Sequence, residues 1–258
     1  PQPSDPRRLI FFVGFPRSGT TLLEQILASH PDVLALDERH ALAEATRDLF
    51  VSDPKLERLR TITAEEAQVY REGYWRNVAA YCPDVAGKVF VDKYPLNSER
   101  LPLIAKLFPE ARILFALRDP RDVVLSCFRR RFEMNPAMYE FCTLEGAAAL
   151  YDAVMRLVER YKAVLALPLQ YVRHERVVED LRGEVGAVCD FIGVEWDDAM
   201  LDFAQTARRR GVRTPSAGQV VRGLYDEGIG HWRNYRAELA SVMPLLAPWV
   251  EAFGYPAD

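Results

Sequence analysis

A short run of glycine, hydroxyl and basic side chains near the N-terminus has the composition of an anion-binding loop. It covers residues 14–21 (GFPRSGTT), between the apolar run Leu9–Val13 and a stretch with apolar residues at helical spacing. A buried strand, a glycine-containing loop and a helix N-terminus, in that order, direct several backbone N–H groups at one point. The helix dipole also favours negative charge there. We therefore predict a phosphate-type anion site in this loop.

The spacing Gly14-x-x-x-x-Gly19-x-Thr21 matches the phosphate loop of nucleotide triphosphatases except at one position. That motif has Lys where this chain has Thr20, and the Lys normally reaches the terminal phosphates alongside Mg²⁺. The cation inside this loop is instead Arg17. Because the Lys is missing, the loop does not favour hydrolysis of ATP or GTP. We expect backbone groups, hydroxyls and Arg17 to hold the anion.

Two further basic residues follow apolar runs that predict buried strands. Lys93 comes after 88–92, and Arg118 comes after 112–117. Strands that alternate with helices favour an α/β fold with a doubly wound, mostly parallel sheet of the P-loop type, flanked by helices on both faces. Because ligands of such sheets bind beyond the carboxyl ends of the strands, we expect one ligand to contact Arg17, Lys93 and Arg118.

The length of 258 residues fits one large domain, which we assign to residues 1–258 with 1–7 as a linker or arm. The apolar patterns predict strands at 9–15, 88–92, 112–117 and 169–172. They predict helices at 20–29, 40–50, 64–81, 97–107, 123–132, 144–167, 181–192, 197–207 and 236–252. Core candidates on the early helices are Leu42, Leu49, Val69, Tyr70, Trp75 and Val78.

The loop PRSGTT, the helix after it, the dipeptide His30-Pro31 and the acidic pair Asp37-Glu38 together resemble one enzyme family. This family is the sulfotransferases that use 3′-phosphoadenosine 5′-phosphosulfate (PAPS). The closest resemblance is to tyrosylprotein sulfotransferases and to bacterial domains that often follow tetratricopeptide repeats. It extends over about residues 9–245. The resemblance implies in-line transfer of a sulfuryl group from PAPS to an acceptor hydroxyl, with release of adenosine 3′,5′-bisphosphate.

The resemblance also implies where the cofactor binds. Residues 18–21 (Ser18, Gly19, Thr20 and Thr21) and Arg17 correspond to the loop around the 5′-phosphosulfate. Arg118 and Ser126, eight residues apart, correspond to the pair that holds the 3′-phosphate, and Arg130 to a further contact. Residues 214–216 and 219–220 resemble the loop that closes over the nucleotide, and Ser216 falls on a position there that contacts the phosphosulfate. His231 stands where relatives carry Lys or Arg. His174 replaces a Tyr that contacts the cofactor in relatives, so that contact is not carried over.

The same family uses a Lys and a carboxylate in catalysis. Lys93 corresponds to a Lys that touches the sulfuryl group or the bridging oxygen, and with Arg17 and Ser216 it would stabilise charge on the leaving phosphate. A carboxylate accepts the proton of the acceptor hydroxyl. Asp37 aligns with the catalytic Glu of tyrosylprotein sulfotransferases and Glu38 with that of the bacterial domains. Because adjacent residues of an extended segment point opposite ways, we expect only one of them to face the cofactor. We favour Glu38, because its longer side chain matches the residue type that both groups use.

Two other functions stay open at this point. A small-molecule kinase with a degenerate phosphate loop would need ATP and Mg²⁺, with Asp92 and Asp119 as the candidate ligands. A catalytically inactive nucleotide-binding scaffold would not need the basic and acidic groups found here. The four histidines show no metal-ligand spacing such as HExxH, so we predict no metal.

Charge and composition limit the partners. With a net charge of −4 we expect no nucleic-acid partner, and without an apolar run near 18 residues we expect no membrane span. The four cysteines have no CxxC spacing and are expected to be buried thiols of a reducing compartment, which favours a cytoplasmic location. The acceptor is either a small hydroxyl compound or an acidic tyrosine peptide, for which residues 208–210 and 213 offer basic side chains. The sequence leaves the oligomeric state open.

Overall fold

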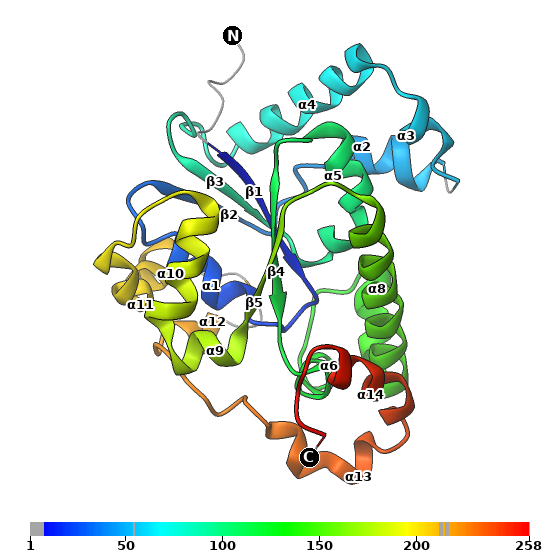
Figure 1. The fold of residues 1–258 in the computed structure, drawn as a ribbon, viewed down its shortest axis with the longest axis vertical. Helices are drawn as coiled ribbons and strands as arrows, with labels where there is room; N and C mark the ends of the chain where they lie inside the picture. The colour runs from blue at the N-terminus through cyan, green and yellow to red at the C-terminus, as the bar shows by residue number, and fades with distance from the viewer. Residues whose placement is uncertain (1–7, 54, 212–213, 215–216, 258) are drawn as a thin grey trace.

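Five parallel strands form a single sheet in the order β2-β3-β1-β4-β5 (Figure 1). The structure, a computed structural model, describes residues 8–53, 55–211, 214 and 217–257. The strands are β1 (Arg8–Gly14), β2 (Val33–Asp37), β3 (Val89–Lys93), β4 (Arg112–Leu117) and β5 (Leu169–Arg173). The predicted P-loop-type α/β sheet is confirmed, and its five strands are all parallel.

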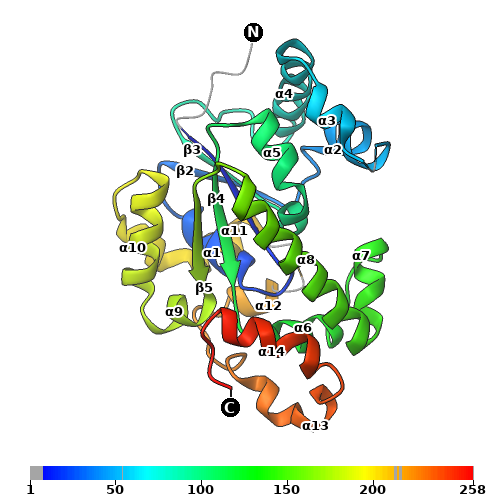
Figure 2. The ribbon, with the colours of Figure 1, turned by 45° about the vertical axis from the view of Figure 1, so that its right-hand side comes forward.

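Helices cover both faces of this sheet (Figures 1 and 2). One face carries α1 (Thr20–Leu27), α9 (His174–Glu179), α10 (Leu181–Ile192), α11 (Phe203–Arg210) and α12 (Ala217–Val220). The other carries α2 (Ala43–Thr46), α4 (Ala64–Ala79), α5 (Leu101–Leu107), α6 (Pro120–Phe128), α8 (Leu144–Val164) and α14 (Met243–Ala252). Shorter helices are α3 (Glu57–Thr61), α7 (Pro136–Tyr139) and α13 (Arg236–Leu239). A π-helical turn spans Arg47–Val51, and 3₁₀ turns span Pro95–Arg100, Glu140–Cys142, Asp198–Asp202 and His231–Tyr235.

The strands divide their side chains between two apolar cores. Phe11 and Phe115 point to the α8 face, and Ile10 and Leu114 point to the α1 face, all with no exposed surface. Burial of such a side chain contributes roughly 1.5–3 kcal/mol. The sheet is therefore held from both sides by apolar cores.

Local capping fixes the helix that carries much of the predicted site. α6 begins with Pro120, and the Asp119 carboxylate caps it by accepting the Arg121 backbone N–H at 3.0 Å. The same carboxylate accepts two guanidinium bonds from Arg121, at 2.9 and 2.8 Å. This cap orients α6 so that Ser126, two turns later, faces the loop after β1.

Several predicted elements differ from the structure. The predicted strands agree to within a residue, but β2 was not predicted, because its sequence (VLALD) has a single β-branched residue and no aromatic residue. The helix predicted at 40–50 is a short α2 followed by a π-helical turn. Val69 was wrongly placed in the core, since its side chain is 65% exposed. Cys142 is likewise exposed rather than buried.

None of the helices described here is long and apolar enough to cross a membrane.

Candidate active site

The loop after β1 has the backbone of an anion cradle. Gly14 needs its small size because a Cβ there would lie 2.8 Å from the Ala116 carbonyl oxygen of β4. Gly19 begins α1 in a left-handed conformation (φ 90°) without a side-chain cap. The first turn of α1 carries no acidic residue, so no carboxylate of that turn competes for its N–H groups.

Arg17 lies at the centre of the loop, in a left-handed conformation (φ 71°) that non-glycine residues rarely adopt. Its Nε donates to Ser126 Oγ of α6 at 3.0 Å, and its Nη2 donates to Gln219 Oε1 of α12 at 3.0 Å. Burial lowers the pKa of Arg17 to about 10, with a further lowering from Arg118, so the guanidinium stays charged at neutral pH. The loop therefore presents a buried cation held by two distant helices.

One side of Arg17 opens into a cavity of about 380 Å³, the arginine pocket. Its lining residues are Arg17, Arg118, Asp122, Leu125, Ser126, Arg129, Arg130, Gln219, Tyr225, Glu227, Gly228 and His231. Arg118 donates to the Arg17 carbonyl at 3.1 Å and to the Gly228 carbonyl, while its buried Nε has no partner among the described residues. Arg118 and Ser126, which the resemblance assigned to the 3′-phosphate, thus line one cavity together with Arg130 and His231.

Asp122 anchors the segment that carries His231 beside this cavity. The carboxylate accepts the backbone N–H groups of Gly230 at 2.7 Å and Trp232 at 2.8 Å. Burial raises the pKa of Asp122, although Arg118 lowers it in part. His231 itself lies 2.6 Å from Arg129 Nη1 through its Nε2. Asp122 therefore holds the backbone on both sides of His231, and Arg129 contacts the imidazole itself.

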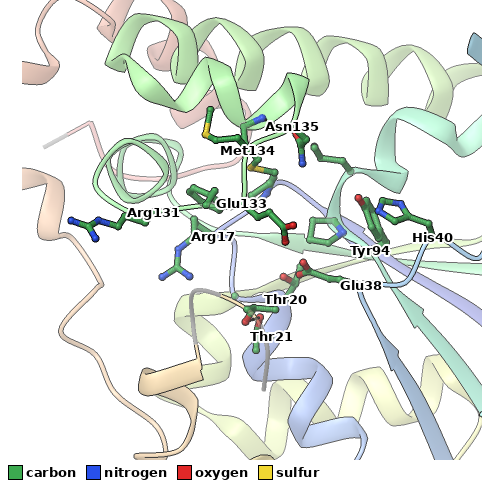
Figure 3. A pocket seen from close by; sticks show the side chains of 17 residues that line it. Arg17, Thr20, Thr21, Glu38, His40, Tyr94, Arg131, Glu133, Met134 and Asn135 are labelled. Carbon is green, nitrogen blue, oxygen red and sulfur yellow. Dashed lines mark hydrogen bonds between the residues drawn. The ribbon is translucent and has the colours of Figure 1, made fainter. Parts of the chain in front are cut away.

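The other side of Arg17 opens into a larger cavity of about 590 Å³, the Glu38 pocket (Figure 3). Its polar lining consists of Arg17, Thr20, Thr21, Glu38, His40, Arg131, Glu133, Asn135 and Thr214. Its apolar and aromatic lining includes Pro16, Tyr94, Pro95, Leu96, Phe132, Met134 and Met138. Glu38 and the start of α1 lie on one wall, and Glu133 points in from the opposite wall (Figure 3). The anion loop and a carboxylate thus share one cavity.

Lys93 and the acidic pair form a buried ion cluster at the end of β3. The Lys93 ammonium, wholly inaccessible, donates to Asp37 and to Glu38, the latter at 2.8 Å. Burial alone would lower the pKa of Lys93, but Glu38, Asp37 and Glu24 together raise it. Lys93 is not among the residues that line the Glu38 pocket. In this arrangement its charge acts on Glu38, and its contact with a sulfuryl group stays a prediction.

Asp37 and Glu38 face different cavities, as expected, but their carboxylates do not point in opposite directions. Glu38 lines the Glu38 pocket, whereas Asp37 lines a separate cavity of about 250 Å³ beside Arg210. Both carboxylates nevertheless meet the same ammonium. The reason is the left-handed backbone of Glu38 (φ 47°), the residue directly after β2. Side chains alternate only along extended backbone, and the extended backbone ends at Asp37.

His174 lies behind the loop, at the end of β5. A Cβ added to Gly19 would lie 2.6 Å from its Nδ1, so the ring packs directly against the loop glycine. Burial lowers the pKa of His174 to about 3, and Arg118 and Arg17 add to the effect. The ring is therefore neutral at physiological pH. Its buried Nδ1 has no partner within the described part of the chain.

Other predicted site residues fall outside these cavities. Ser216 and Arg213 lie outside the described residues. The basic residues 208–210 are exposed, and two of them also bond to other segments: Arg208 donates to the Val221 carbonyl at 2.7 Å, and Arg210 donates to Glu24 at 2.6 Å. Asp92 accepts from Tyr74 in the apolar core at 3.0 Å, and Asp119 holds Arg121, so neither candidate Mg²⁺ ligand reaches the loop.

Sequence reasoning missed Glu133, which lines the Glu38 pocket and belongs to the segment after α6, where nothing in the local pattern marks a site. Thr214 and Gln219 belong to the stretch that resembles the loop over the nucleotide. They contact the anion loop through Thr21 (3.0 Å) and Arg17 (3.0 Å), which lie 193 and 202 residues away in the sequence. Within the described residues, no group of three or more His, Cys, Asp or Glu is arranged to hold a metal ion.

The fold and the site define a class of protein. A parallel sheet with an anion loop between β1 and α1, and cationic side chains beyond the ends of β3 and β4, is the framework of P-loop-type group-transfer enzymes. A family model described as the sulfotransferase family matches residues 9–198, which is most of the chain. The chain therefore belongs to the sulfotransferase family.

Individual relatives agree with this assignment. The chain is 26% identical over 264 residues to the protein-tyrosine sulfotransferase of Drosophila melanogaster, a match that covers 96% of this chain and 51% of that protein. It is also 26% identical over 247 residues to an uncharacterized protein of Aquifex aeolicus, covering 93% of this chain and 32% of that protein. The chain thus spans a third to a half of the length of these two relatives.

A solved structure agrees over the whole chain. The sulfotransferase domain from the Synechococcus PCC 7002 olefin synthase superposes with a TM-score of 0.68 at 25% sequence identity. The match covers 100% of this chain and 98% of that one.

Proposed function

We propose that this protein transfers a sulfuryl group from PAPS to an acceptor hydroxyl, with Glu38 as the base. The observation that carries the proposal is the sharing of Arg17 between two cavities. One cavity is lined by four arginines, and the other contains Glu38 together with the loop residues Thr20 and Thr21. A donor with phosphate groups at both ends of its ribose and an acceptor with a hydroxyl group need this combination.

The residues present fit the phosphate groups of PAPS. The buried Arg118 Nε lacks a partner among the described residues, and an unpaired buried guanidinium N–H is costly unless an anion or water completes it. Arg118, Ser126 and Arg130 would hold the 3′-phosphate. The loop from Ser18 to Thr21 would hold the 5′-phosphate through its N–H groups. His231 would lie at the edge of the same cavity.

When bound, PAPS supplies an activated sulfuryl group whose bond to the 5′-phosphate breaks as the acceptor oxygen attacks in line. Glu38 accepts the proton of the acceptor hydroxyl during that attack. Lys93 holds the Glu38 carboxylate in place through the 2.8 Å bond, and Asp37 holds Lys93 from the other side. Arg17 stabilises the charge that builds on the leaving phosphate.

Backbone strain supports the same assignment. Within the described residues, the non-glycine residues with positive φ are Arg17, Glu38 and Leu56. Strain of this kind costs about 1–3 kcal/mol per residue and gathers at functional sites. Two of the three strained residues therefore flank the cavity in which the transfer is proposed.

The acceptor is a phenolic hydroxyl, as in tyrosine. Tyr94, Phe132 and the two methionines give the Glu38 pocket an apolar wall that suits an aromatic ring. The protein-tyrosine sulfotransferases among the relatives support this choice. Whether the phenol belongs to a small molecule or to an acidic peptide is decided by the experiment.

Two measurements test the proposed function. Calorimetric titration with adenosine 3′,5′-bisphosphate and with ATP separates this function from the kinase alternative, and we expect binding of the former only. Transfer of labelled sulfate from PAPS to simple phenols, aliphatic alcohols and acidic tyrosine peptides then identifies the acceptor. A protein that binds the bisphosphate but transfers to none of these acceptors would be an inactive scaffold.

A further inference from the structure

A second ion pair, between the buried Glu24 and the partly exposed Arg210, lies on the α1 face of the sheet. Glu24 of α1 has no exposed surface. Its Oε1 accepts from Arg210 Nη1 at 2.6 Å, and its Oε2 accepts from Gln25 Nε2 at 2.5 Å. Arg210 ends α11 and also donates from Nη2 to the Ala35 carbonyl of β2 at 2.7 Å. The pair therefore ties α1 and α11 to β2, two residues before Asp37.

This pair belongs to the same electrostatic cluster as Lys93. Burial raises the pKa of Glu24, while Lys93 and Arg210 lower it and Asp37 raises it further. Glu24 in turn is one of the three carboxylates that raise the pKa of Lys93 against the effect of burial. The cluster thus holds three carboxylates, Glu24, Asp37 and Glu38, against two cations, Lys93 and Arg210.

The ratio of carboxylates to cations in this cluster bears on which carboxylates Lys93 can bind. A carboxylate that is buried without a cation is strongly unfavourable. Arg210 bonds to Glu24, and the two hydrogen bonds of Lys93 go to Asp37 and Glu38. Without Arg210, Lys93 is the remaining cation whose charge acts on Glu24, so one ammonium would face three carboxylates.

We propose that Glu24 and Arg210 are positioning residues, which keep Lys93 on Glu38 and fix the end of β2 that carries this carboxylate. The inference rests on the proposed role of Glu38 as the base. Neither residue lines the Glu38 pocket or the arginine pocket, so both act through Lys93 and β2 rather than on a substrate.

Variants that remove or keep the charges of Arg210 and Glu24 test the proposal. In Arg210→Met we expect kcat to fall about 10²-fold at saturating PAPS and acceptor, since a misplacement of 1 Å can have that effect. The affinity for adenosine 3′,5′-bisphosphate should change less than kcat. Arg210→Lys keeps the charge and should retain most of the rate. The double variant Glu24→Gln/Arg210→Met removes both charges and restores the original balance around Lys93. It should recover the part of kcat that depends on Lys93, but not the part that depends on the Arg210 bond to the Ala35 carbonyl.

Two results would overturn the proposal. One is an unchanged kcat in Arg210→Met, and the other is a double variant that is no better than Arg210→Met, as a purely structural role predicts. If Arg210→Met does not fold, Arg210→Gln takes its place with the same expectations.

A crystal structure of the single variant separates this proposal from the proposed function. We expect Lys93 Nζ to have moved within hydrogen-bond distance of Glu24, and this holds even if the wild-type protein transfers no sulfuryl group. A lysine that stays on Asp37 and Glu38 without Arg210 would contradict the positioning role. Absence of transfer by the wild type, with the lysine moved as expected, would contradict only the proposed function.

Discussion

The two cavities on either side of Arg17 differ in charge and in chemistry. The arginine pocket has four arginines against two carboxylates in its lining, whereas the Glu38 pocket has two arginines against two carboxylates and a large apolar wall. The first is suited to bind a phosphorylated nucleotide, and the second to admit a neutral hydroxyl compound next to a base. The difference suggests that binding of the donor and removal of the proton are the tasks of separate residues.

The strongest test of this division is Glu38→Gln. We expect kcat to fall by about 10²–10⁴, the usual contribution of a general base. The affinity for adenosine 3′,5′-bisphosphate should stay at the wild-type value, because Glu38 is not in the arginine pocket. The measurements are initial rates and calorimetric titration.

Asp37→Asn is the matched control for Glu38→Gln. Both carboxylates bind Lys93, but only Glu38 lines the cavity with the loop. A nearly active Glu38→Gln beside an inactive Asp37→Asn would reverse the assignment of the base. Two active variants would remove the acidic pair from the mechanism and end the contrast between the cavities.

Arg118→Ala tests the other side of the comparison. A charge-assisted hydrogen bond is worth roughly 1.5–3 kcal/mol, so affinity for the bisphosphate should fall about ten- to a hundredfold. The variant should also lose its preference for the 3′-phosphorylated nucleotide over the 3′-dephospho form. Competition titrations with the two nucleotides measure this. An intact preference would show that the 3′-phosphate is not held by Arg118.

Asp92→Asn changes a buried carboxylate that belongs to neither cavity. Burial raises the pKa of Asp92 to about 7 from 3.8, even though Tyr74 and Lys93 lower it. Between these two pH values the folded state holds a proton that the unfolded state has lost, so stability falls as pH rises from about 4 to about 7. The total is a few kcal/mol, at about 1.4 kcal/mol per pKa unit.

The Asn variant should lack this slope and be more stable than the wild type at pH 8. Urea unfolding at pH 5 and pH 8 provides the measurement. Equal slopes in the two proteins would show that Asp92 is ionised in the folded state. In a pH–rate profile, a loss of activity can come from unfolding or from a change in the base of the Glu38 pocket. The unfolding measurements on the two proteins separate these two causes.

The smallest expected effect is that of a chelator. The proposed transfer relies on Arg17, Lys93 and the loop N–H groups for charge stabilisation, so we expect the rate in EDTA to equal the rate without it. Loss of transfer on chelation, restored by Mg²⁺, would favour the kinase alternative and require a metal in one of the two cavities.

Much of the fold could be predicted from local pattern. The apolar runs around Phe11, Phe90 and Phe115 predicted three adjacent strands because strands buried on both faces have no polar alternation. β2 was missed because its five residues (VLALD) include one β-branched and no aromatic side chain, which gives a weak strand signal. The helix at 40–50 was misjudged because propensity does not predict a π-helical turn.

The sequence by itself determined the anion loop, since the types and spacing of Gly14, Arg17 and Gly19 specify a local backbone. It also determined that Asp37 and Glu38 follow the first helix and that Arg118 precedes Ser126 by eight residues. These are properties of short segments, which depend on the backbone requirements of a few neighbouring residues.

Only the tertiary structure decided which residues share a cavity. Parallel pairing placed Asp37 opposite Lys93, so the acidic pair binds a lysine 56 residues away rather than a neighbouring arginine. The left-handed backbone of Glu38 and the inward turn of Arg210 to Glu24 depend on the same packing. A buried charge is unfavourable unless an opposite charge lies beside it. Such pairs form only when the sheet and its helices are assembled.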